Sequence, residues 1–160
     1  KAICFDPSTK KASEIATRMF DISKQNWKIL QVSSGDIDKA NNIIDGDFRS
    51  WWTTAEDQSK PQEVVIDLGG AFNLSGFTYW PMQERWVSGV ITHYEFFVSL
   101  NLQHWEKVSE GEFGNIWNNL VEQKINFDPI KGRYIKLRAA KIHGGGFNAS
   151  IGEIGVITTK

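Results

Sequence analysis

The sequence predicts an all-β protein built as an antiparallel β-sandwich, and two observations carry this prediction. Short apolar runs recur along the chain, several with the apolar–polar alternation of a half-buried strand. Turn-forming stretches such as DLGG, EGEFGN and DPIKG separate these runs. Many short strands with such turns between them are typical of sandwiches and barrels. The predicted strands cover residues 63–69, 76–80, 93–99, 104–109, 121–127, 133–140 and 151–158.

The alternation is clear in segment 93–99, where Tyr94, Phe96 and Val98 fall on one face of the predicted strand. We expect this face to point into the core. Helix signal is weak by comparison. One helical turn is expected in DKANNII, with Asp38 as its N-cap.

Composition excludes several classes of protein. A chain of 160 residues is one domain by default, and a net charge of -1 with a pI near 6.3 argues against binding to nucleic acid or a membrane surface. No stretch approaches the roughly 20 apolar residues of a membrane span. Cys4 is the single cysteine, so no internal disulfide framework forms, and the redox compartment stays open. The chain starts at KAICFD with no recognisable signal peptide, so we expect a piece of a longer protein.

A metal site is suggested by the stretch NNIIDGDFRSWWTT, residues 41–54. Ca²⁺ prefers six to eight oxygen ligands, and Asp45, Ser50 and carbonyls turned inward around Gly46 could supply several of them. The spacing is not that of an EF-hand, so a remote acid is needed, and Glu153 is the candidate. The alternative is a simple Asx turn with a solvated carboxylate.

From about Trp27 onward, the ordered segments of the chain resemble the discoidin or F5/8 type C domain, whose bacterial form is the family 32 carbohydrate-binding module. The matching segments are ANNIIDGDFRSWWTT, QEVVIDLG, GFTYWP, GVITHYEFFVSLNLQHWEKV, GRYIKLRA and SIGEIGV. The resemblance implies a discoidin-like jelly roll of the galactose-binding-domain type. It also implies a noncatalytic module that targets an attached enzyme to glycans. The arrangement YWPMQERWVSGVITHYEFFVS resembles modules at the C-terminus of α-L-fucosidase-type glycoside hydrolases, which implies such a parent enzyme.

The resemblance also implies a ligand set for the metal, which we expect to be a structural Ca²⁺, with Na⁺ as the alternative. The core Trp of the family corresponds to Trp52, and Trp51 is expected to cover the metal loop. The implied ligands are the carbonyls of Asn42 and Asp47, the carboxylate of Asp45, the hydroxyl and carbonyl of Ser50, and Gly152 and Glu153.

Residues 1–22 differ from the rest of the chain and read as strand, turn, strand, with AICF and SEIATRMF as the strands. Two strands alone are marginally stable in water. The stretch resembles the final hairpin of the small β-sandwich that precedes sugar-binding domains in some glycosidases. We therefore expect residues 1–22 to be the tail of a preceding β-domain or a linker hairpin, and residues 23–160 to be the binding module.

Three predicted loops could bind a sugar, because each pairs an aromatic ring or a polar cluster with residues that can reach hydroxyl groups. For Trp86 the alternative is a lid over the sandwich edge, and for Phe147 it is a half-buried residue of a flexible hairpin. Trp117 is interpreted as cover for the core, with a secondary contact as the alternative. The candidate residues are Gln83, Glu84, Arg85 and Trp86; His143, Phe147 and Asn148; and Thr53 and Glu56.

The chain departs from its galactose-binding relatives at three positions. Those relatives carry a His after the core Trp, an Arg after the Pro of the YxP motif, and an Asn before the next strand. Here Thr53, Met82 and approximately Ser88 stand in these places. These differences argue against binding of plain galactose. Three alternatives remain: binding of a different sugar, binding at a neighbouring subsite, or a loss of binding.

Three classes of function have some support in the sequence. An enzyme of the glycosidase type needs two carboxylates at a set separation, and Glu56, Asp57 or Glu84 could supply them, but no motif supports this class. A lipid or protein interaction would rest on the tip Trp86–Val87 alone. The favoured reading is a glycan-binding module, tethered to a catalytic domain in the same chain and secreted, periplasmic or on the bacterial cell surface. The alternative is a structural domain of that enzyme without sugar binding. Nucleic acid is not an expected partner, and neither is a membrane.

Overall fold

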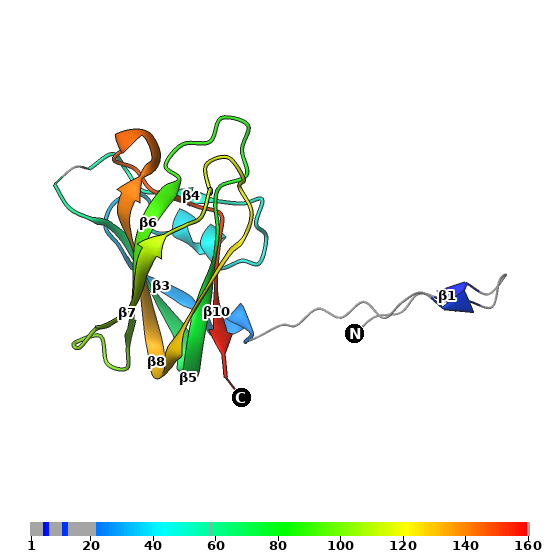
Figure 1. Cartoon of the computed structure of the whole chain (residues 1–160). Helices are drawn as coiled ribbons and strands as arrows, with labels where there is room; N and C mark the ends of the chain where they lie inside the picture. The colour runs from blue at the N-terminus through cyan, green and yellow to red at the C-terminus, as the bar shows by residue number, and fades with distance from the viewer. Residues whose placement is uncertain (1–4, 7–10, 13–21, 58, 160) are drawn as a thin grey trace.

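A computed structural model of the chain describes residues 5–6, 11–12, 22–57 and 59–159 (Figure 1). These residues form antiparallel strands and short 3-10 turns without an α-helix, so the prediction of an all-β sandwich is confirmed. None of the described helical turns is long or apolar enough to cross a membrane. The strands are β1 (Phe5–Asp6), β2 (Lys11–Ala12), β3 (Lys28–Val32), β4 (Trp52–Thr53), β5 (Gln62–Trp80), β6 (Ile91–Ser99), β7 (Glu106–Glu112), β8 (Gln123–Ile142), β9 (Ser150–Ile151) and β10 (Glu153–Thr158), and the 3-10 turns are η1 (Lys24–Asn26), η2 (Lys39–Ile43) and η3 (His143–Gly145).

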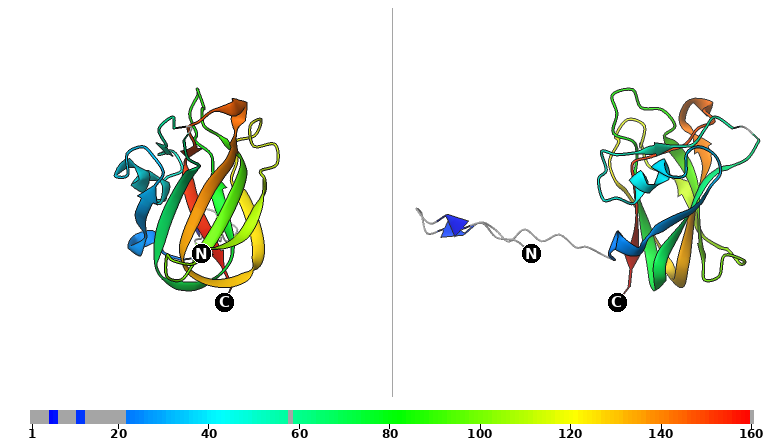
Figure 2. Two further views of the ribbon diagram at one scale, coloured as in Figure 1. Left: turned by 90° about the vertical axis from the view of Figure 1, so that its left-hand side faces the viewer. Right: turned by 180° about the vertical axis from the view of Figure 1, so that it is seen from behind.

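Two long strands, β5 and β8, run through both parts of the sandwich (Figure 2). Residues 62–67 of β5 pair with residues 134–139 of β8, and residues 72–79 pair with residues 123–132. The first half of this ladder is flanked by β3 and β6, with β7 beyond β6, whereas the second half is flanked by β10. The β5–β8 pair therefore holds the two layers together.

The predicted turns DLGG and DPIKG lie where β5 and β8 bend back, so that each strand begins and ends at the same end of the sandwich (Figure 2). DLGG lies at a break in the pairing of β5 with β8, between Asp67 and Phe72, and DPIKG overlaps a second break, opposite Leu74 and Gly76. Both segments stay within continuous strands. Gly69 adopts a left-handed φ of 75°, and its N–H donates to the Asp67 carboxylate at 2.8 Å. The glycine thus allows a local irregularity that redirects the strand instead of ending it.

Stacked aromatic rings fill the space between the layers. Phe77 of β5 lies against Phe96 of β6 with ring centroids 4.0 Å apart, and both side chains are fully buried. Tyr94 is buried beside them, as the alternation in segment 93–99 predicts. Trp52 is 3% exposed, which confirms its assignment to the core. Burial also raises the pKa of the Tyr79 phenol, whose hydroxyl donates to the carbonyl of Ser150 at 2.9 Å.

The predicted helical turn exists as η2, but its cap differs from the prediction. Asp38 occupies the N-cap position without a side-chain hydrogen bond to the turn. The Asp36 carboxylate accepts from the backbone N–H groups of Asp38 and Lys39 at 2.9 and 3.4 Å. The Asx turn at Asp36, two residues earlier, therefore caps η2.

The N-terminal segment is described only in part. β1 and β2 pair with each other, Phe5 with Ala12 and Asp6 with Lys11. Most of the predicted strands AICF and SEIATRMF lies outside the described residues. The division into residues 1–22 and 23–160 stays a prediction.

Removing the charge of Asp67 should destabilise the fold in a pH-dependent way. The Arg133 guanidinium binds both carboxylate oxygens at 3.0 and 2.9 Å and holds the pKa of Asp67 below its ordinary range. A lowered folded pKa stabilises the protein above the unfolded pKa, about 3.9, and this stabilisation is lost as the pH falls through the folded pKa. We expect Asp67→Asn to lower the free energy of unfolding by roughly 1–2 kcal/mol near neutral pH.

Urea denaturation near pH 7 and again near pH 2.5 measures this effect, and the loss should shrink at the lower pH. Asp128→Asn is the matched control, because Asp128 is an exposed residue of β8. An equal loss at both pH values would contradict the assignment.

Candidate functional site

The predicted metal loop brings four oxygen atoms together around Ser50. The Ser50 hydroxyl lies 3.0 Å from the carbonyl of Asn42, 2.8 Å from the Asp45 carboxylate and 2.8 Å from the carbonyl of Asp47. A hydroxyl carries one hydrogen, so it can donate fully to one of these three oxygens. The other oxygens face it without an intervening proton, an arrangement that a cation would stabilise.

The backbone of the loop explains this convergence. Gly46 adopts a φ of 85°, and the Asp45 carboxylate accepts from the N–H of Asp47 at 2.7 Å. The Asx turn considered from the sequence is therefore present, but it uses Oδ1 of Asp45 and leaves Oδ2 toward Ser50. The side chain of Asp47 pairs with Arg49, which lowers the pKa of Asp47, so its carbonyl and not its carboxylate faces the cluster.

Glu153 approaches the same loop from the last strand. It is 7% exposed, and burial raises the pKa of its carboxyl group, against the effect of Lys24. The charge of Asp45 raises this pKa further, while the N–H of Gly46 lowers it. The Lys24 ammonium contacts Oε1 of Glu153 and the carbonyl of Ile154. Oε2 is buried without a partner among the described residues.

The other side of the loop is held against the end of β5. Phe48 stacks on Trp80 with centroids 5.0 Å apart, and the N–H of Gly152 donates to the carbonyl of Trp80 at 2.8 Å. A Cβ at Gly152 would lie 2.9 Å from the carbonyl of Pro81 and 3.3 Å from that of Phe48, so only glycine fits here. Trp51, expected to cover the loop, is 36% exposed, and its carbonyl accepts from the Asn42 side chain.

The loop is therefore rich in carbonyl and hydroxyl oxygens but poor in acids. Among the residues that the structure describes, no three Asp, Glu, His or Cys side chains gather into one cluster. Asp45 and Glu153 supply the carboxylates, and backbone carbonyls with the Ser50 hydroxyl must supply the rest. This mixture suits a hard cation such as Ca²⁺ and not a transition metal.

The three predicted sugar loops meet at one end of the sandwich (Figure 1). β4 pairs with β9, which joins the loop after Trp52 to the loop that precedes β10. Thr54 strengthens this junction, because its hydroxyl accepts from the N–H of Ala149 at 2.8 Å and its N–H donates to the carbonyl of Ala149 at 2.9 Å. These hydrogen bonds hold the loop after β4 against the loop before β9.

A groove of about 460 Å³, which we call the Phe147 groove, opens at this end. Phe147 lies at its rim and is 46% exposed, so about half of its surface is open to a ligand. Two glycines of the 143–147 loop line the groove beside it, and neither carries a side chain that could block it. The opposite wall comes from the loop before β5. The lining residues are Asp57, Lys60, Pro61, Gln62, Ala139, Ala140, Lys141, Ile142, Gly145, Gly146 and Phe147.

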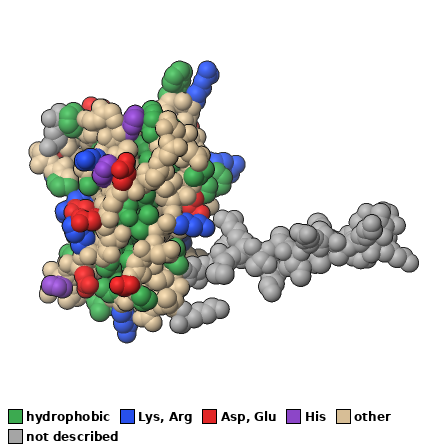
Figure 3. Space-filling view, in the orientation of Figure 1, with side chains coloured by type: hydrophobic (Ala, Val, Ile, Leu, Met, Phe, Trp, Pro, Cys, Tyr) green, Lys and Arg blue, Asp and Glu red, His purple; other side chains and the backbone are tan. Residues whose placement is uncertain are grey.

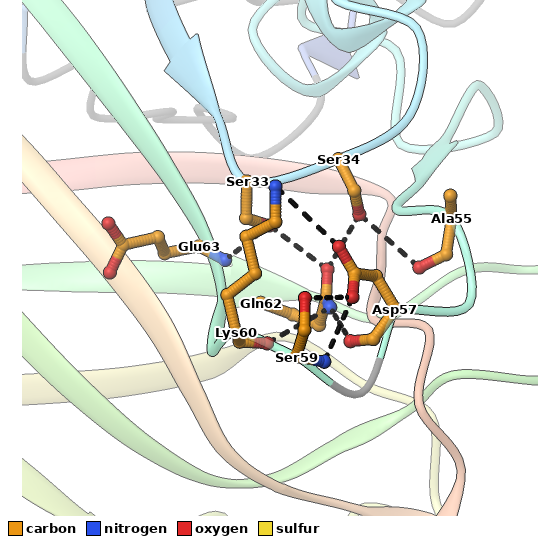
Figure 4. A network of polar contacts seen from close by, with 8 residues as sticks. All are labelled: Ser33, Ser34, Ala55, Asp57, Ser59, Lys60, Gln62 and Glu63. Atoms are coloured by element: carbon orange, nitrogen blue, oxygen red, sulfur yellow. Dashed lines mark hydrogen bonds and ion pairs between the residues drawn. The ribbon is translucent and has the colours of Figure 1, made fainter.

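A network of polar contacts holds the wall of the groove in place (Figure 4). The Gln62 amide oxygen accepts from the hydroxyls of Ser33 and Ser34 at 3.0 and 2.8 Å. Its amide nitrogen donates to the carbonyls of Asp57 and Lys60 at 2.6 and 3.3 Å. Buried Gln62 therefore fastens the loop to β3 and preorganises one side of the groove.

A second hollow of about 330 Å³ lies between the loop after β5 and the loop after β7, and we call it the Trp86–Trp117 cleft. Trp86 is 83% exposed, with the Arg85 guanidinium 5.3 Å from its ring, and a hydrophobic and a basic side chain protrude at this end (Figure 3). The lid alternative for Trp86 is excluded by this exposure. The cleft is lined by Glu84, Arg85, Trp86, Val87, Trp117 and Leu120.

Trp117 differs from its interpretation as core cover. It is 42% exposed, and its ring stacks on His143 with centroids 3.5 Å apart and an interplanar angle of 6°. Its neighbours in NIWNNL are mostly polar, which was the one local signal for exposure. The partner, His143, lies in another loop and could not be inferred from the local sequence.

Comparison with known proteins identifies the family of this chain. Residues 23–154 match the F5/8 type C domain. The chain belongs to the F5/8 type C domain family. The module CpGH89CBM32-5 of Clostridium perfringens, in complex with GalNAc-β-1,3-galactose, superimposes with a TM-score of 0.74 at 29% identity, over 85% of this chain and 98% of that one. The family 32 module of C. perfringens NanJ, in complex with galactose, gives 0.71 at 28% identity, over 84% and 96%.

Two curated relatives are similar to this chain over part of their own length. A sialidase of Micromonospora viridifaciens is 31% identical over 123 residues, 74% of this chain and 18% of the relative. A galactose oxidase of Gibberella zeae is 27% identical over 139 residues, 84% of this chain and 20% of the relative. The chain thus spans about a fifth of the length of these relatives.

The remaining predicted residues of this F5/8 type C domain fall into different settings. Glu56 is exposed, while Thr53 and Asn148 are half-buried at the loop end. The amide of Gln83 is committed to the protein, because it donates to the carbonyls of Pro81 and Leu120 at 2.9 and 3.0 Å. Gln83 therefore ties two loops together.

Met82 is 4% exposed, so the position where galactose-binding relatives carry an Arg holds a buried apolar side chain. No polar group projects toward a ligand from this place. The sequence difference from the galactose-binding relatives therefore also changes the surface at this position.

Removing Lys24 should destabilise the domain in chelator-treated buffer. Glu153 would then keep a buried carboxylate without its ammonium partner, since the two side chains are only 25% and 9% exposed. We expect Lys24→Met to lower the free energy of unfolding by roughly 1–3 kcal/mol. The double variant Lys24→Met, Glu153→Gln should recover most of this loss, because the uncompensated charge is gone. Urea denaturation of the full double-mutant cycle measures the coupling, and strictly additive effects would rule it out.

Proposed function

We propose that this F5/8 type C domain is a noncatalytic carbohydrate-binding module that targets an attached glycoside hydrolase to glycans. The observation that carries the proposal is the loop end, where the exposed rings of Phe147 and Trp86 lie beside polar groups. Aromatic faces can pack against the C–H face of a pyranose, and the polar groups can bond its hydroxyls. The two superimposed C. perfringens modules, each in complex with a sugar, support this reading.

The proposed sugar contacts are the residues predicted from the sequence, with changed roles for some. Phe147 is the stacking ring of the groove, and Glu56, Thr53 and Asn148 are proposed as polar contacts from the loops that follow Trp52 and Phe147. Glu84, Arg85 and Trp86 act at the other hollow, while Gln83 and His143 position the residues around them. Since Met82 is buried, we expect a glycan other than plain galactose.

In this proposal the module acts through its attachment to an enzyme. A weak module held near a glycan raises the local concentration of its catalytic neighbour and multiplies a modest affinity. We propose an α-L-fucosidase-type parent and a secreted, periplasmic or cell-surface location in a bacterium. The parent enzyme rests on the sequence resemblance of residues 79–99, and the location rests on the similarity to bacterial family 32 modules.

A structural domain without sugar binding is the second candidate, and the burial of Met82 is the observation that favours it. In that case the exposed rings of Trp86 and Phe147 would pack against a neighbouring domain.

We also propose that the metal loop holds a structural Ca²⁺, with Na⁺ as the alternative. Two features fit a cation: the Ser50 hydroxyl set among three oxygens, and the buried Oε2 of Glu153 without a described partner. A bound ion would join the first loop of the domain to its last strand. Its free energy of binding would then add to the stability of the fold. The proposed ligands are Asn42, Asp45, Asp47, Ser50, Gly152 and Glu153.

The sugar proposal predicts selective binding on a glycan array that carries galactosylated, fucosylated and amino-sugar glycans. Phe147→Ala should weaken binding to the recognised glycan by about tenfold, because the stacking face is lost. Trp105→Ala is the control, since Trp105 belongs to the turn between β6 and β7 at the opposite end of the sandwich. A folded protein that binds no glycan would move the assignment to the structural candidate.

The metal proposal predicts that Ca²⁺ stabilises the chelator-treated protein. At about 100 times the Kd the gain is roughly 2.7 kcal/mol, seen as a rise in Tm. Ser50→Ala should reduce this gain, whereas Ser75→Ala in β5 should keep it. Titration with NaCl in place of CaCl₂ identifies the ion. Equal Tm values with and without both salts would refute a structural metal.

A further inference from the structure

The two hollows at the loop end are linked through one short segment, residues 142–147. Segment 142–147, which contains η3, lines the Phe147 groove with Ile142, Gly145 and Gly146. The same segment carries His143, whose ring stacks on Trp117 in the Trp86–Trp117 cleft. One short loop therefore contacts both the Phe147 groove and Trp117 of the cleft.

The tip of this loop consists of two glycines, which have no side chain. Gly144 and Gly145 have φ values of 69° and 70°, a conformation that favours glycine. A Cβ built on either residue would meet no atom within 4 Å. The space above the loop is open, so an extended ligand could cross from the groove to the cleft.

The ring of Trp117 is held in a defined orientation. His143 covers one of its faces, and the backbone of His143 is fixed by a hydrogen bond from its N–H to the carbonyl of Val90 at 2.9 Å. With 42% of Trp117 exposed, the indole still offers surface to a ligand. A stacking ring that is already oriented loses little entropy on binding.

The opposite side of the cleft combines an aromatic ring with free polar groups. Trp86 is 83% exposed, and Glu84 and Arg85 form no hydrogen bond or ion pair with any residue that the structure describes. Gln83 links this loop to Leu120 and so fixes the two sides relative to each other. Arg85 can donate to hydroxyl oxygens, and Glu84 can accept from hydroxyl groups.

We propose that the Trp86–Trp117 cleft binds a second pyranose unit of the glycan whose first unit lies in the Phe147 groove. Its volume of about 330 Å³ is at the small end of ligand pockets, as a single sugar ring requires. The inference rests on the proposed function and deepens it, because it makes an oligosaccharide, and not a monosaccharide, the ligand. Trp117 and Trp86 contact the second unit, and His143 is a positioning residue that orients Trp117.

Calorimetric titration tests the inference with two kinds of ligand. The first are GalNAc-β-1,3-galactose and each oligosaccharide recognised on the array; the second are their terminal monosaccharides. We expect Trp117→Ala to weaken binding of the oligosaccharide by about tenfold and to leave the monosaccharide unchanged. Phe147→Ala should weaken both ligands, and Trp105→Ala should weaken neither. His143→Ala should reproduce part of the Trp117→Ala effect, and His143→Phe should restore binding by restoring the stack.

The outcomes separate the inference from the proposed function. If Trp117→Ala binds the oligosaccharide like the wild type while Phe147→Ala does not, the second contact is refuted and the module remains a glycan binder. If Trp117→Ala weakens the monosaccharide and the oligosaccharide equally, the first unit lies in the cleft, and the two-unit arrangement is wrong. If the folded wild type binds none of the ligands, both the inference and the proposed function fail.

Discussion

The antiparallel ladder between β5 and β8 is the interaction on which the rest of this domain depends. Both strands are long enough to take part in each layer, and their pairing breaks and resumes between Asp67 and Phe72. Because the break redirects both strands together, β3 and β6 join one half of the ladder and β10 joins the other. The core aromatics Phe77 and Phe96 then face each other across the layers.

The same ladder places the functional loops. β5 ends at Trp80, β8 begins at Gln123, and their pairing brings these ends together. Because both strands bend back in the middle, β8 also ends here, and the loops that follow β5, β7 and β8 emerge at one end of the sandwich (Figure 2). Local contacts then give each loop its shape: Gln62 fixes the wall of the groove, Gln83 joins two loops, and Thr54 holds the first loop to the last.

The metal loop and the loop end offer two different kinds of chemistry. The metal loop concentrates oxygen atoms around Ser50 and faces the buried carboxylate of Glu153, an arrangement that suits a cation. The loop end instead exposes aromatic rings beside polar groups, an arrangement that suits a neutral polyol. Because the two regions are separate, a change at the loop end such as Met82 leaves the oxygen-rich loop undisturbed.

Much of this protein could be predicted from the sequence alone, because strand periodicity and turn chemistry are local properties. The alternation of segment 93–99 identified the buried face, the segments around Trp52 indicated the family, and Asp45, Gly46 and Ser50 marked the oxygen-rich loop. Only the tertiary structure decided the continuity of β5 and β8 through the predicted turns. It also decided the exposure of Trp117, its stack on His143, and the pairing of Lys24 with Glu153. These features depend on strand register and on contacts between residues far apart in the chain. Local periodicity reports which side of a strand is buried but not which distant residue lies against it.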